Sequence, residues 1–307
     1  MKPVRIAIVG MGKIARDQHL PAVAANDDFQ LVATVSRSTA ADMGVTSRRT
    51  LGALLDEGPA IDAVALCTPP QVRHALAAQA LEHGLHVFLE KPPGATIAEV
   101  HALADMAKEQ RVTLFASWHS RYAAGVEPAR LWLADKIIRS VAIVWREDVR
   151  VWHPGQDWIW EPGGLGVFDP GINALSIATQ ILPRRFFLTE ATLSLPSNRA
   201  APIAADLAFR DSAGLQITMN LDWRHTGPEI WDIVVETDAG TCTLSQGGSV
   251  LTLPHDRLNR EDLEYSGLYA RFASLVRTGR SDVDLAPMQL VADAFLCGKR
   301  FAVEAFD

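Results

Sequence analysis

The chain has 307 residues, of which 48% are hydrophobic and 21% charged, values typical of a folded globular protein. This length allows one large domain or two ordinary ones, and the composition excludes a disordered chain, a collagen-like repeat and a disulfide-dense miniprotein. Lys and Arg number 29 against 36 Asp and Glu, so the net charge of -7 argues against nucleic acid or an anionic membrane as a partner.

The three cysteines, Cys67, Cys242 and Cys297, are far apart and show no metal-ligand spacing. We therefore expect free thiols in a reducing cytosol and no metal site. Residues 4–10 form a short apolar run, but Lys13 follows at once without a small-residue cleavage site. No apolar run approaches the roughly 18 residues of a membrane-spanning helix. We expect the N-terminal run to be a strand of a cytoplasmic protein.

The first 120 residues alternate short apolar segments with helical patterns. Strands are expected at 4–10, 30–36, 62–68, 86–90 and 113–116, and helices from about 13 and at 51–57, 71–83 and 97–110. This alternation is typical of βαβ units whose parallel strands are buried on both faces. Because such crossovers are right-handed, it predicts a Rossmann α/β domain with a doubly wound parallel sheet over residues 1–120.

After residue 120 the pattern changes to longer strands with a period of two. One helix is expected at 127–135, strands at 140–149, 187–194, 204–209, 215–223, 231–236, 241–245 and 250–253, and closing helices at 268–278 and 287–304. Residues 121–307 are thus predicted to form a C-terminal α+β domain for substrate binding, with a mostly antiparallel open sheet of about six strands.

A phosphate-binding signature follows the first expected strand, where the chain reads G-x-G-x-x-A. Gly10 allows a tight turn, Gly12 lets the backbone approach a pyrophosphate, and Ala15 lets the helix pack close to the strand. Lys13 and Ile14 lie at the start of that helix, where the backbone favours an anion. In this context the loop predicts a dinucleotide held by Gly10, Gly12, Lys13 and Ile14.

The end of the second expected strand bears on the choice of cofactor. An NAD site usually has Asp or Glu there for the ribose 2′-hydroxyl, but this chain has Ser36 and Arg37. Ser36 can donate a hydrogen bond, and Arg37 can pair with a 2′-phosphate. NADP is therefore predicted as the preferred cofactor with NAD as an alternative, unless Arg37 is only a solvated loop residue.

Two further motifs end strands at the edge where such sheets bind ligands. The sequence Thr-Pro-Pro follows the third strand, and Glu-Lys-Pro follows the fourth. The proline restricts the lysine before it to an extended conformation. We assign Thr68, Pro69, His74, Glu90 and Lys91 to cofactor binding.

The order of these motifs, followed by an antiparallel sheet domain, resembles the glucose–fructose oxidoreductase, inositol dehydrogenase and MocA family along the whole chain. A later segment, 163–173, resembles the family's glycine-rich segment, which opens a helix and usually carries Asp and then His four residues on. These positions hold Asp169 and Asn173, which share a helix face. Asn173 can hydrogen-bond but cannot exchange a proton at neutral pH, so proton transfer falls to Lys91 and Asp169. These three are the expected catalytic residues.

Within the family, the sequence resembles the bacterial aldose 1-dehydrogenases that act on L-arabinose and D-galactose. The matching segments are 12–19, 118–121, 152–156, 158–164 and 168–173. The resemblance implies NAD(P)-dependent oxidation of the anomeric carbon of L-arabinose, D-galactose or D-fucose to a lactone. It also implies a dimer or tetramer formed through the exposed face of the C-terminal sheet. Another sugar or polyol dehydrogenase, an NAD-dependent glycosidase and a non-catalytic dinucleotide-sensing regulator are the alternatives.

Oxidation of a hemiacetal needs a hydride acceptor, a base for the C1 hydroxyl proton and groups that hold the other hydroxyls. A lysine with an ordinary pKa of about 10.4 is a poor base at neutral pH. We therefore expect Lys91 to contact the C1 hydroxyl and Asp169 to orient it or pass the proton on. Which of the two is the kinetic base stays open, and a helix N-cap is the competing reading of Asp169.

The remaining substrate residues are expected beside these two. Glu147 alternates with Trp145 on an expected strand, so both face one side of the sheet. Histidines can hydrogen-bond sugar hydroxyls, and indole rings suit the apolar face of a pyranose. We assign His119, Glu147, Trp152, His153, Asn173 and Trp231 to the substrate, together with Lys91 and Asp169, and Trp145, Trp158 and Trp160 to the core.

Overall fold

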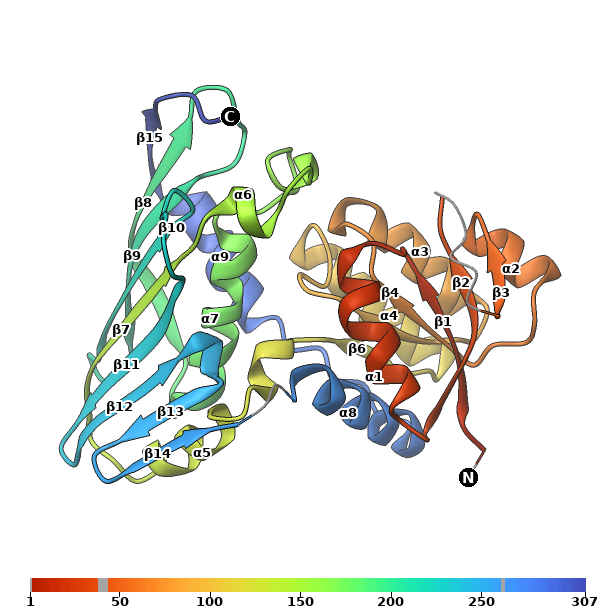
Figure 1. Ribbon diagram of the computed structural model, residues 1–307, viewed down its shortest axis with the longest axis horizontal. Coiled ribbons are helices and arrows are strands. Elements are labelled where there is room, and N and C mark those ends of the chain that lie inside the picture. Colours follow the sequence, from red (N-terminus) through yellow and green to blue (C-terminus); the bar gives the residue numbers. More distant parts are fainter. Residues whose placement is uncertain (1, 38–43, 261–262) are drawn as a thin grey trace. The chain divides into compact units, whose positions relative to one another are not determined.

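The computed structural model describes residues 2–37, 44–260 and 263–307 of the chain (Figure 1). It divides into two compact units. The first unit comprises the residues up to 119 together with 265–285, and the second comprises 120–264 together with 286–307. No helix in these ranges combines the length and the apolar character needed to cross a membrane.

The first unit is built on a parallel sheet. Its strands are β1 (Val4–Val9), β2 (Phe29–Val35), β3 (Thr46–Arg48), β4 (Ala63–Leu66), β5 (His86–Leu89) and β6 (Leu114–Ala116). They lie in the order β3-β2-β1-β4-β5-β6, and every pair is parallel. All four residues of β4 are fully buried, as expected for a strand covered on both faces. The predicted doubly wound sheet is confirmed, with β3 as an additional edge strand.

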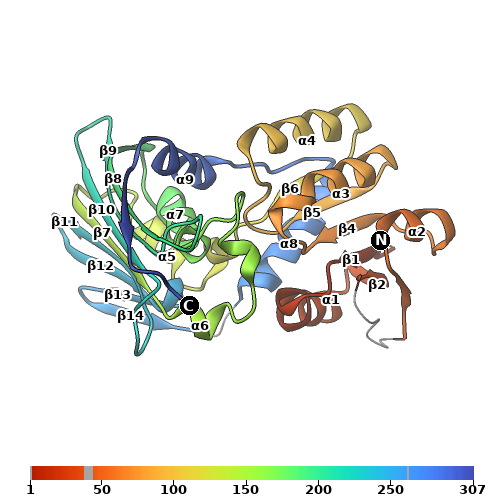
Figure 2. The same cartoon turned by 90° about the horizontal axis from the view of Figure 1, so that it is seen from above.

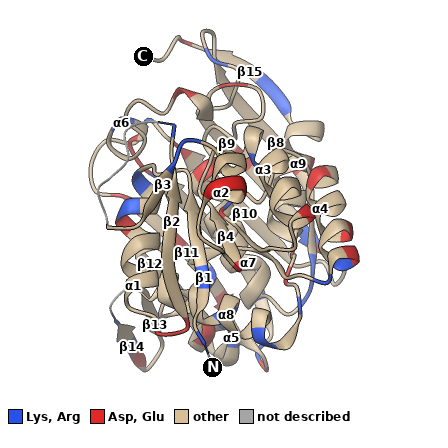
Figure 3. Ribbon diagram, turned by 90° about the vertical axis from the view of Figure 1, so that its right-hand side faces the viewer, with Lys and Arg blue, Asp and Glu red and all other residues tan. Residues whose placement is uncertain are grey.

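Helices cover both faces of this sheet. A helical segment follows the glycine loop as a π-helical turn, η1 (Ala15–His19), and then α1 (Leu20–Ala24). The others are α2 (Leu51–Glu57), α3 (Pro70–Glu82), α4 (Ile97–Gln110) and α8 (Glu264–Thr278). Figure 2 shows α3 and α4 on one face and α1 and α8 on the other. Asp and Glu mark α2 and α4 in Figure 3, in keeping with the acidic composition.

Helix α8 belongs to this unit because its aromatic rings complete the core. The ring of Phe272 stacks on Phe29 with centroids 5.8 Å apart, and Tyr269 stacks on Phe88 at 5.3 Å. The sequence assigned all of 121–307 to one domain, whereas the structure places residues 265–285 in the first unit. The sequence pattern near α8 does not indicate this packing, because Phe29 and Phe88 lie about 180 or more residues earlier in the chain.

The second unit contains a larger, mixed sheet. Its strands are β7 (Ile138–Arg146), β8 (Phe186–Pro196), β9 (Ala204–Asp211), β10 (Gln216–Asp222), β11 (Ile230–Thr237), β12 (Gly240–Ser245), β13 (Val250–Leu253), β14 (Asp256–Asn259) and β15 (Lys299–Val303). The order is β14-β13-β12-β11-β7-β10-β9-β8-β15. Only the pairs β7–β10 and β8–β15 are parallel within the described ranges. The mostly antiparallel character is confirmed, but this sheet has nine strands among the described residues rather than about six.

The helices of this unit gather on one face of the sheet, and the opposite face carries no helix from the described residues of this unit (Figure 1). They are α5 (Val126–Leu133), α6 (Val149–Trp152), α7 (Phe168–Ile181) and α9 (Ala286–Cys297), with short 3-10 turns η2 (His119–Tyr122), η3 (Asp157–Ile159) and η4 (Gln246–Gly248). Helix α7 packs tightly against the sheet at Gly171. A Cβ on its Gly171 would lie 2.6 Å from Leu221 Cδ1.

Two expected elements were wrong at their ends. The strand expected at 140–149 stops at Arg146, and the side chain of Asp148 accepts a hydrogen bond from the Arg150 amide (2.9 Å) to begin α6. The helix expected at 287–304 ends at Cys297. Residues after Gly298 form β15, which pairs with β8 instead of continuing the helix.

Candidate active site

The glycine loop joins the end of β1 to the start of a helix. Gly10 has φ +94°, and a Cβ there would lie 2.8 Å from Thr68 Cγ2 and 3.0 Å from the carbonyl carbon of Cys67. Only glycine therefore fits against the end of β4. A Cβ on Gly12 would meet no atom within 4 Å, so the backbone there faces open space. Together with fully buried Ala15 at the helix start, this arrangement fits the pyrophosphate of a dinucleotide.

Arginines gather at the carboxyl ends of β2 and β3. Arg37 is exposed just beyond β2, and the Ser36 amide donates to the carbonyl of Arg48 (3.0 Å) at the end of β3. The Arg48 guanidinium donates to the carbonyls of Ser47 (3.1 Å) and Glu57 (3.2 Å), so it braces α2. The next residue, Arg49, is exposed. The sequence singles out Arg37 but not Arg49, because the three-residue strand β3 gives no local strand pattern.

A buried arginine joins the strand ends that carry the other predicted cofactor residues. Arg73, on α3 beside half-buried His74, is 2% exposed. Its guanidinium donates to the carbonyls of Thr68, Glu90 and Pro92. It therefore holds the end of β4 against the turn after β5, where Lys91 stands. The sequence does not indicate this contact, because Arg73 lies 17 residues before Glu90.

The carboxylate of Glu90 is buried and accepts three hydrogen bonds. Its Oε1 lies 2.9 Å from His19 Nε2 and accepts from the Tyr265 hydroxyl at 2.7 Å. Its Oε2 accepts from the amide of Lys91 at 2.7 Å. His19 is fully buried, and its Nδ1 lies 2.8 Å from the Tyr269 hydroxyl. Residues from the glycine-loop helix, β5 and α8 thus meet at one carboxylate.

This cluster is electrostatically matched. Burial alone would raise the pKa of Glu90, but hydrogen bonding and charge interaction with His19 hold that pKa well below its usual range. Burial opposes protonation of His19, yet interactions with Cys67, Tyr269 and Glu90 raise its pKa well above the ordinary value. Both directions favour a carboxylate on Glu90 paired with an imidazolium on His19. His119 stacks on the Tyr265 ring, with centroids 5.6 Å apart.

In the second unit, three of the predicted substrate residues converge. Glu147 and Asp169 are each 3% exposed, Glu147 just after β7 and Asp169 in the first turn of α7. His153 Nε2 lies 3.7 Å from Glu147 Oε1 and 3.8 Å from Asp169 Oδ2. His153 Nδ1 is buried and finds no hydrogen-bond partner within the described ranges. An imidazole between two carboxylates can hold and orient a polyhydroxylated ligand.

Indole groups hold Glu147 in place. Trp223 Nε1 donates to Glu147 Oε1 (3.2 Å), and Trp231 Nε1 donates to Oε2 (2.8 Å). Trp152 is 39% exposed, and its ring lies 5.1 Å from that of Trp231. Trp223 is fully buried at the end of β10, and sequence reasoning missed it. Its place beside Glu147 depends on the parallel pairing of β10 with β7, which no local pattern indicates.

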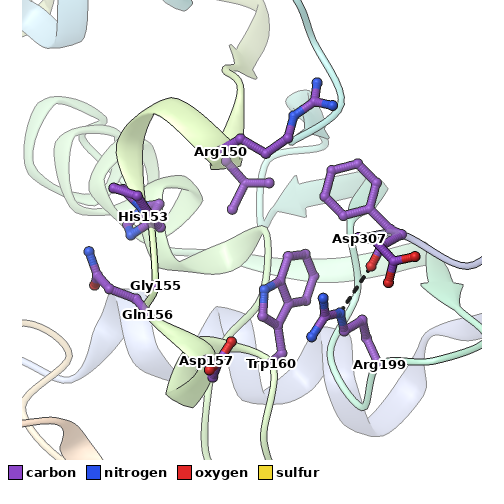
Figure 4. A pocket seen from close by; sticks show the side chains of 11 residues that line it. Arg150, His153, Gly155, Gln156, Asp157, Trp160, Arg199 and Asp307 are labelled. Carbon is purple, nitrogen blue, oxygen red and sulfur yellow. Dashed lines mark hydrogen bonds between the residues drawn. The ribbon is translucent and has the colours of Figure 1, made fainter.

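Further residues of the second unit surround Glu147, His153 and Asp169. Asn173 follows Asp169 by one turn of α7 and is half-buried, and Trp145 and Trp160 are buried. A pocket of about 200 Å³ adjoins His153, and Figure 4 shows Trp160 between His153 and Arg199 in its lining. No group of three or more His, Cys, Asp or Glu side chains in the described chain could hold a metal ion.

The predicted site residues are divided between the two units. The first unit holds Gly10, Gly12, Lys13, Ile14, Ser36, Arg37, Thr68, Pro69, His74, Glu90, Lys91 and His119, and the second holds Glu147, Trp152, His153, Asp169, Asn173 and Trp231. Within each unit they cluster at the strand and helix ends described above. A parallel sheet with an open glycine loop defines the first unit as the dinucleotide-binding part of an oxidoreductase.

Comparison with known proteins also indicates a dinucleotide-binding oxidoreductase. Residues 4–117 match the model of the GFO/IDH/MocA oxidoreductase family, which has an NAD-binding Rossmann fold. The chain is 46% identical over 307 residues, all of its length and 99% of the relative's, to galactose 1-dehydrogenase of Pseudomonas fluorescens. The protein therefore belongs to this family, as the resemblance predicted, and is an NAD(P)-dependent oxidoreductase.

Two solved structures extend the comparison. D-galactose-1-dehydrogenase from Rhizobium etli is 57% identical with a TM-score of 0.96, covering 100% of this chain and 99% of that one. The 3-ketoreductase KijD10 of Actinomadura kijaniata, solved with NADP and TDP-benzene, shares the fold with a TM-score of 0.85 at 19% identity, over 98% and 99% of the two chains.

The two glycines of the loop have separable roles. Gly10→Ala should lower the free energy of unfolding by about 2 kcal/mol, because a Cβ there is strained and meets the end of β4. Gly12→Ala should leave stability within about 0.5 kcal/mol but weaken NADP binding at least about tenfold, because its Cβ fills the space for the pyrophosphate. Urea unfolding and a fluorescence titration with NADP measure the two effects. Normal NADP binding by Gly12→Ala would contradict this assignment.

Proposed function

We propose that the protein is an aldose 1-dehydrogenase that oxidises the anomeric carbon of D-galactose, D-fucose or L-arabinose to the lactone. The observation that carries this proposal is the convergence of Glu147, His153 and Asp169 beside the indoles of Trp223 and Trp231. Hydrogen-bonding side chains beside flat aromatic rings suit a sugar, which has polar hydroxyls and an apolar C–H face. The full-length similarity to two galactose 1-dehydrogenases supports the same class of substrate.

The sugar is held through its C2–C4 hydroxyls. Each Glu147 oxygen accepts one indole N–H and keeps a second lone pair for a hydroxyl. His153 and Asn173 supply further polar groups, Trp152 and Trp231 supply aromatic faces, and His119 completes the set. L-Arabinose and D-galactose share their stereochemistry from C2 to C4 and differ at C5. A site that recognises C2–C4 therefore accepts both, and discrimination at C5 amounts to about 1–3 kcal/mol.

Lys91 and Asp169 handle the proton of the C1 hydroxyl. A bound nicotinamide cofactor supplies the hydride acceptor. Lys91 hydrogen-bonds the C1 hydroxyl, and Asp169 orients that hydroxyl or takes the proton onward. Asn173, one turn later on α7, holds the same hydroxyl or its neighbour without exchanging a proton. Burial of Asp169 shields this transfer from bulk water.

A steady-state panel tests the proposal. With NADP, absorbance at 340 nm should rise with D-galactose, D-fucose or L-arabinose and not with myo-inositol, and the product should be the lactone. No signal with any aldose, or a signal with inositol alone, would contradict the proposal. A glycosidase that recycles its cofactor would give sugar cleavage without net NADPH.

In the same assay, Lys91→Ala and Asp169→Ala should each lower kcat at least about 100-fold, the usual size of a positioned acid–base contribution. Matched controls are Lys108→Ala and Asp105→Ala, which remove exposed charges from α4 and should leave kcat unchanged. Near-normal turnover by Lys91→Ala would rule out this mechanism.

NADP is the proposed preferred cofactor, with NAD accepted more weakly. Exposed Arg37, supported by Ser36 and the neighbouring Arg49, offers charge to a 2′-phosphate. Since a hydrogen bond to a charged group contributes about 1.5–3 kcal/mol, Arg37→Ala should raise KM for NADP about tenfold or more and leave KM for NAD nearly unchanged. Arg111→Ala, which removes an exposed charge at the C-terminal end of α4, is the control and should leave both KM values unchanged. Equal constants for NAD and NADP in the wild type would overturn the preference.

The open face of the second unit's sheet is the proposed surface for a homodimer or homotetramer. Its outward residues include half-buried Val144 and Val234 and exposed Ala142, and Phe187 on β8 is 52% exposed. Apolar and small side chains on a flat sheet face suit a self-complementary interface. Light scattering after size exclusion should give a multiple of 33.4 kDa, whereas a monomer mass would contradict this.

The free cysteines support the expected cytoplasmic location.

A further inference from the structure

The buried cluster around Glu90 has no assigned part in the chemistry above, although it adjoins Lys91. Glu90 is 3% exposed and His19 is fully buried. A buried ion pair is seldom more stabilising than well-packed apolar residues of the same volume. Packing alone therefore does not explain why a carboxylate occupies the end of β5. What a carboxylate offers and an apolar side chain lacks is an acceptor for the amide of Lys91.

The contacts immobilise the backbone on both sides of Lys91. Glu90 Oε2 accepts from the Lys91 amide (2.7 Å), while the Arg73 guanidinium holds the carbonyls of Glu90 and Pro92. The carboxylate is itself fixed through Oε1, by His19 Nε2 (2.9 Å) and the Tyr265 hydroxyl (2.7 Å). The backbone on both sides of Lys91 is therefore held in place, which limits the positions that its side chain can reach.

The partners of Glu90 come from elements that are far apart in sequence. His19 lies in the π-helical turn that follows the glycine loop, and Tyr265 lies at the start of α8. His19 is held in turn by the Tyr269 hydroxyl (2.8 Å), and edge-on ring contacts join it to Tyr265 and Phe88. The glycine-loop helix and the turn bearing Lys91 are therefore linked through one carboxylate.

We propose that Glu90, together with His19 and Tyr265, acts as a positioning group that fixes Lys91 for proton handling at the sugar. This inference rests on the role of Lys91 in the proposed function. Glu90 acts through the backbone of Lys91 and not by touching the substrate. A displacement of about 1 Å at a catalytic group can cost about 100-fold in rate, so a loosened Lys91 should turn over slowly even when the cofactor binds normally.

A double-mutant cycle on kcat tests the proposal. Tyr265→Phe removes the hydrogen bond to Glu90 and keeps the ring, and Glu90→Gln keeps the shape and removes the charge. Each should lower kcat about tenfold or more in the wild-type background, and Tyr265→Phe should change the dissociation constant for NADP less than twofold. In the Lys91→Ala background, each should lower the residual kcat less than twofold, because there is no lysine left to position.

Controls separate this role from general loss of structure. Thr241→Val, which removes a hydroxyl that donates to the Glu236 carboxylate (2.9 Å) in the second unit's sheet, should leave kcat unchanged in both backgrounds. An equal loss of kcat from Tyr265→Phe with and without Lys91 would overturn the proposal, as would full activity of Tyr265→Phe in the wild-type background. If Glu90→Gln does not fold, the Tyr265→Phe arm decides alone. Normal turnover by Lys91→Ala itself would instead refute the proposed function.

Discussion

The hydrogen-bonded carboxylate of Glu90 is the interaction on which the first unit's site depends. Parallel strands end at one edge of the sheet, and that edge brings together the glycine loop, the turn bearing Lys91 and the helix that completes the core. Glu90 joins all three, because its oxygens engage His19, Tyr265 and the Lys91 amide. Hydrogen bonding and charge interaction with His19 offset part of the cost of burying that charge. Arg73 supports the same turn through three carbonyl groups.

The second unit applies the same principle to a different carboxylate. Glu147 is buried and accepts from two indole N–H groups, one from β11 and one just beyond β10. These donors fix the carboxylate, while half-buried Trp231 and the more exposed Trp152 keep part of their rings accessible to an apolar surface. His153 then lies within 4 Å of both Glu147 and Asp169. A rigid frame of indoles, carboxylates and an imidazole can recognise a ring of hydroxyls without large rearrangement.

Local motifs account for what the sequence predicted. Gly10 and Gly12 stand in a short strand–turn–helix segment, and their roles follow from backbone geometry within a few residues. The alternation of elements likewise indicated the parallel sheet and the mostly antiparallel sheet, which the structure confirms. Alternation on β7 also placed Trp145 and Glu147 on one side, and both are buried.

Contacts between distant segments account for what the sequence could not show. Arg73 reads as an ordinary helical residue until the fold brings β4 and β5 beside α3. Trp223 meets Glu147 only through the parallel pairing of β10 with β7, and Tyr265 and Tyr269 reach His19 only because α8 returns to the first unit. The sequence predicts helix over the residues of β15, because the apolar residues before Gly298 are followed by Phe301, Ala302 and Val303. The individual roles of the site residues remain predictions.

The most direct test is a structure of the enzyme with NADP and D-galactose bound. The account predicts that Lys91 Nζ and a carboxylate oxygen of Asp169 both lie within about 3.2 Å of the C1 hydroxyl oxygen, with the nicotinamide facing the C1 hydrogen. A sugar bound with either group out of reach of C1, or with another carbon presented to the nicotinamide, would contradict it.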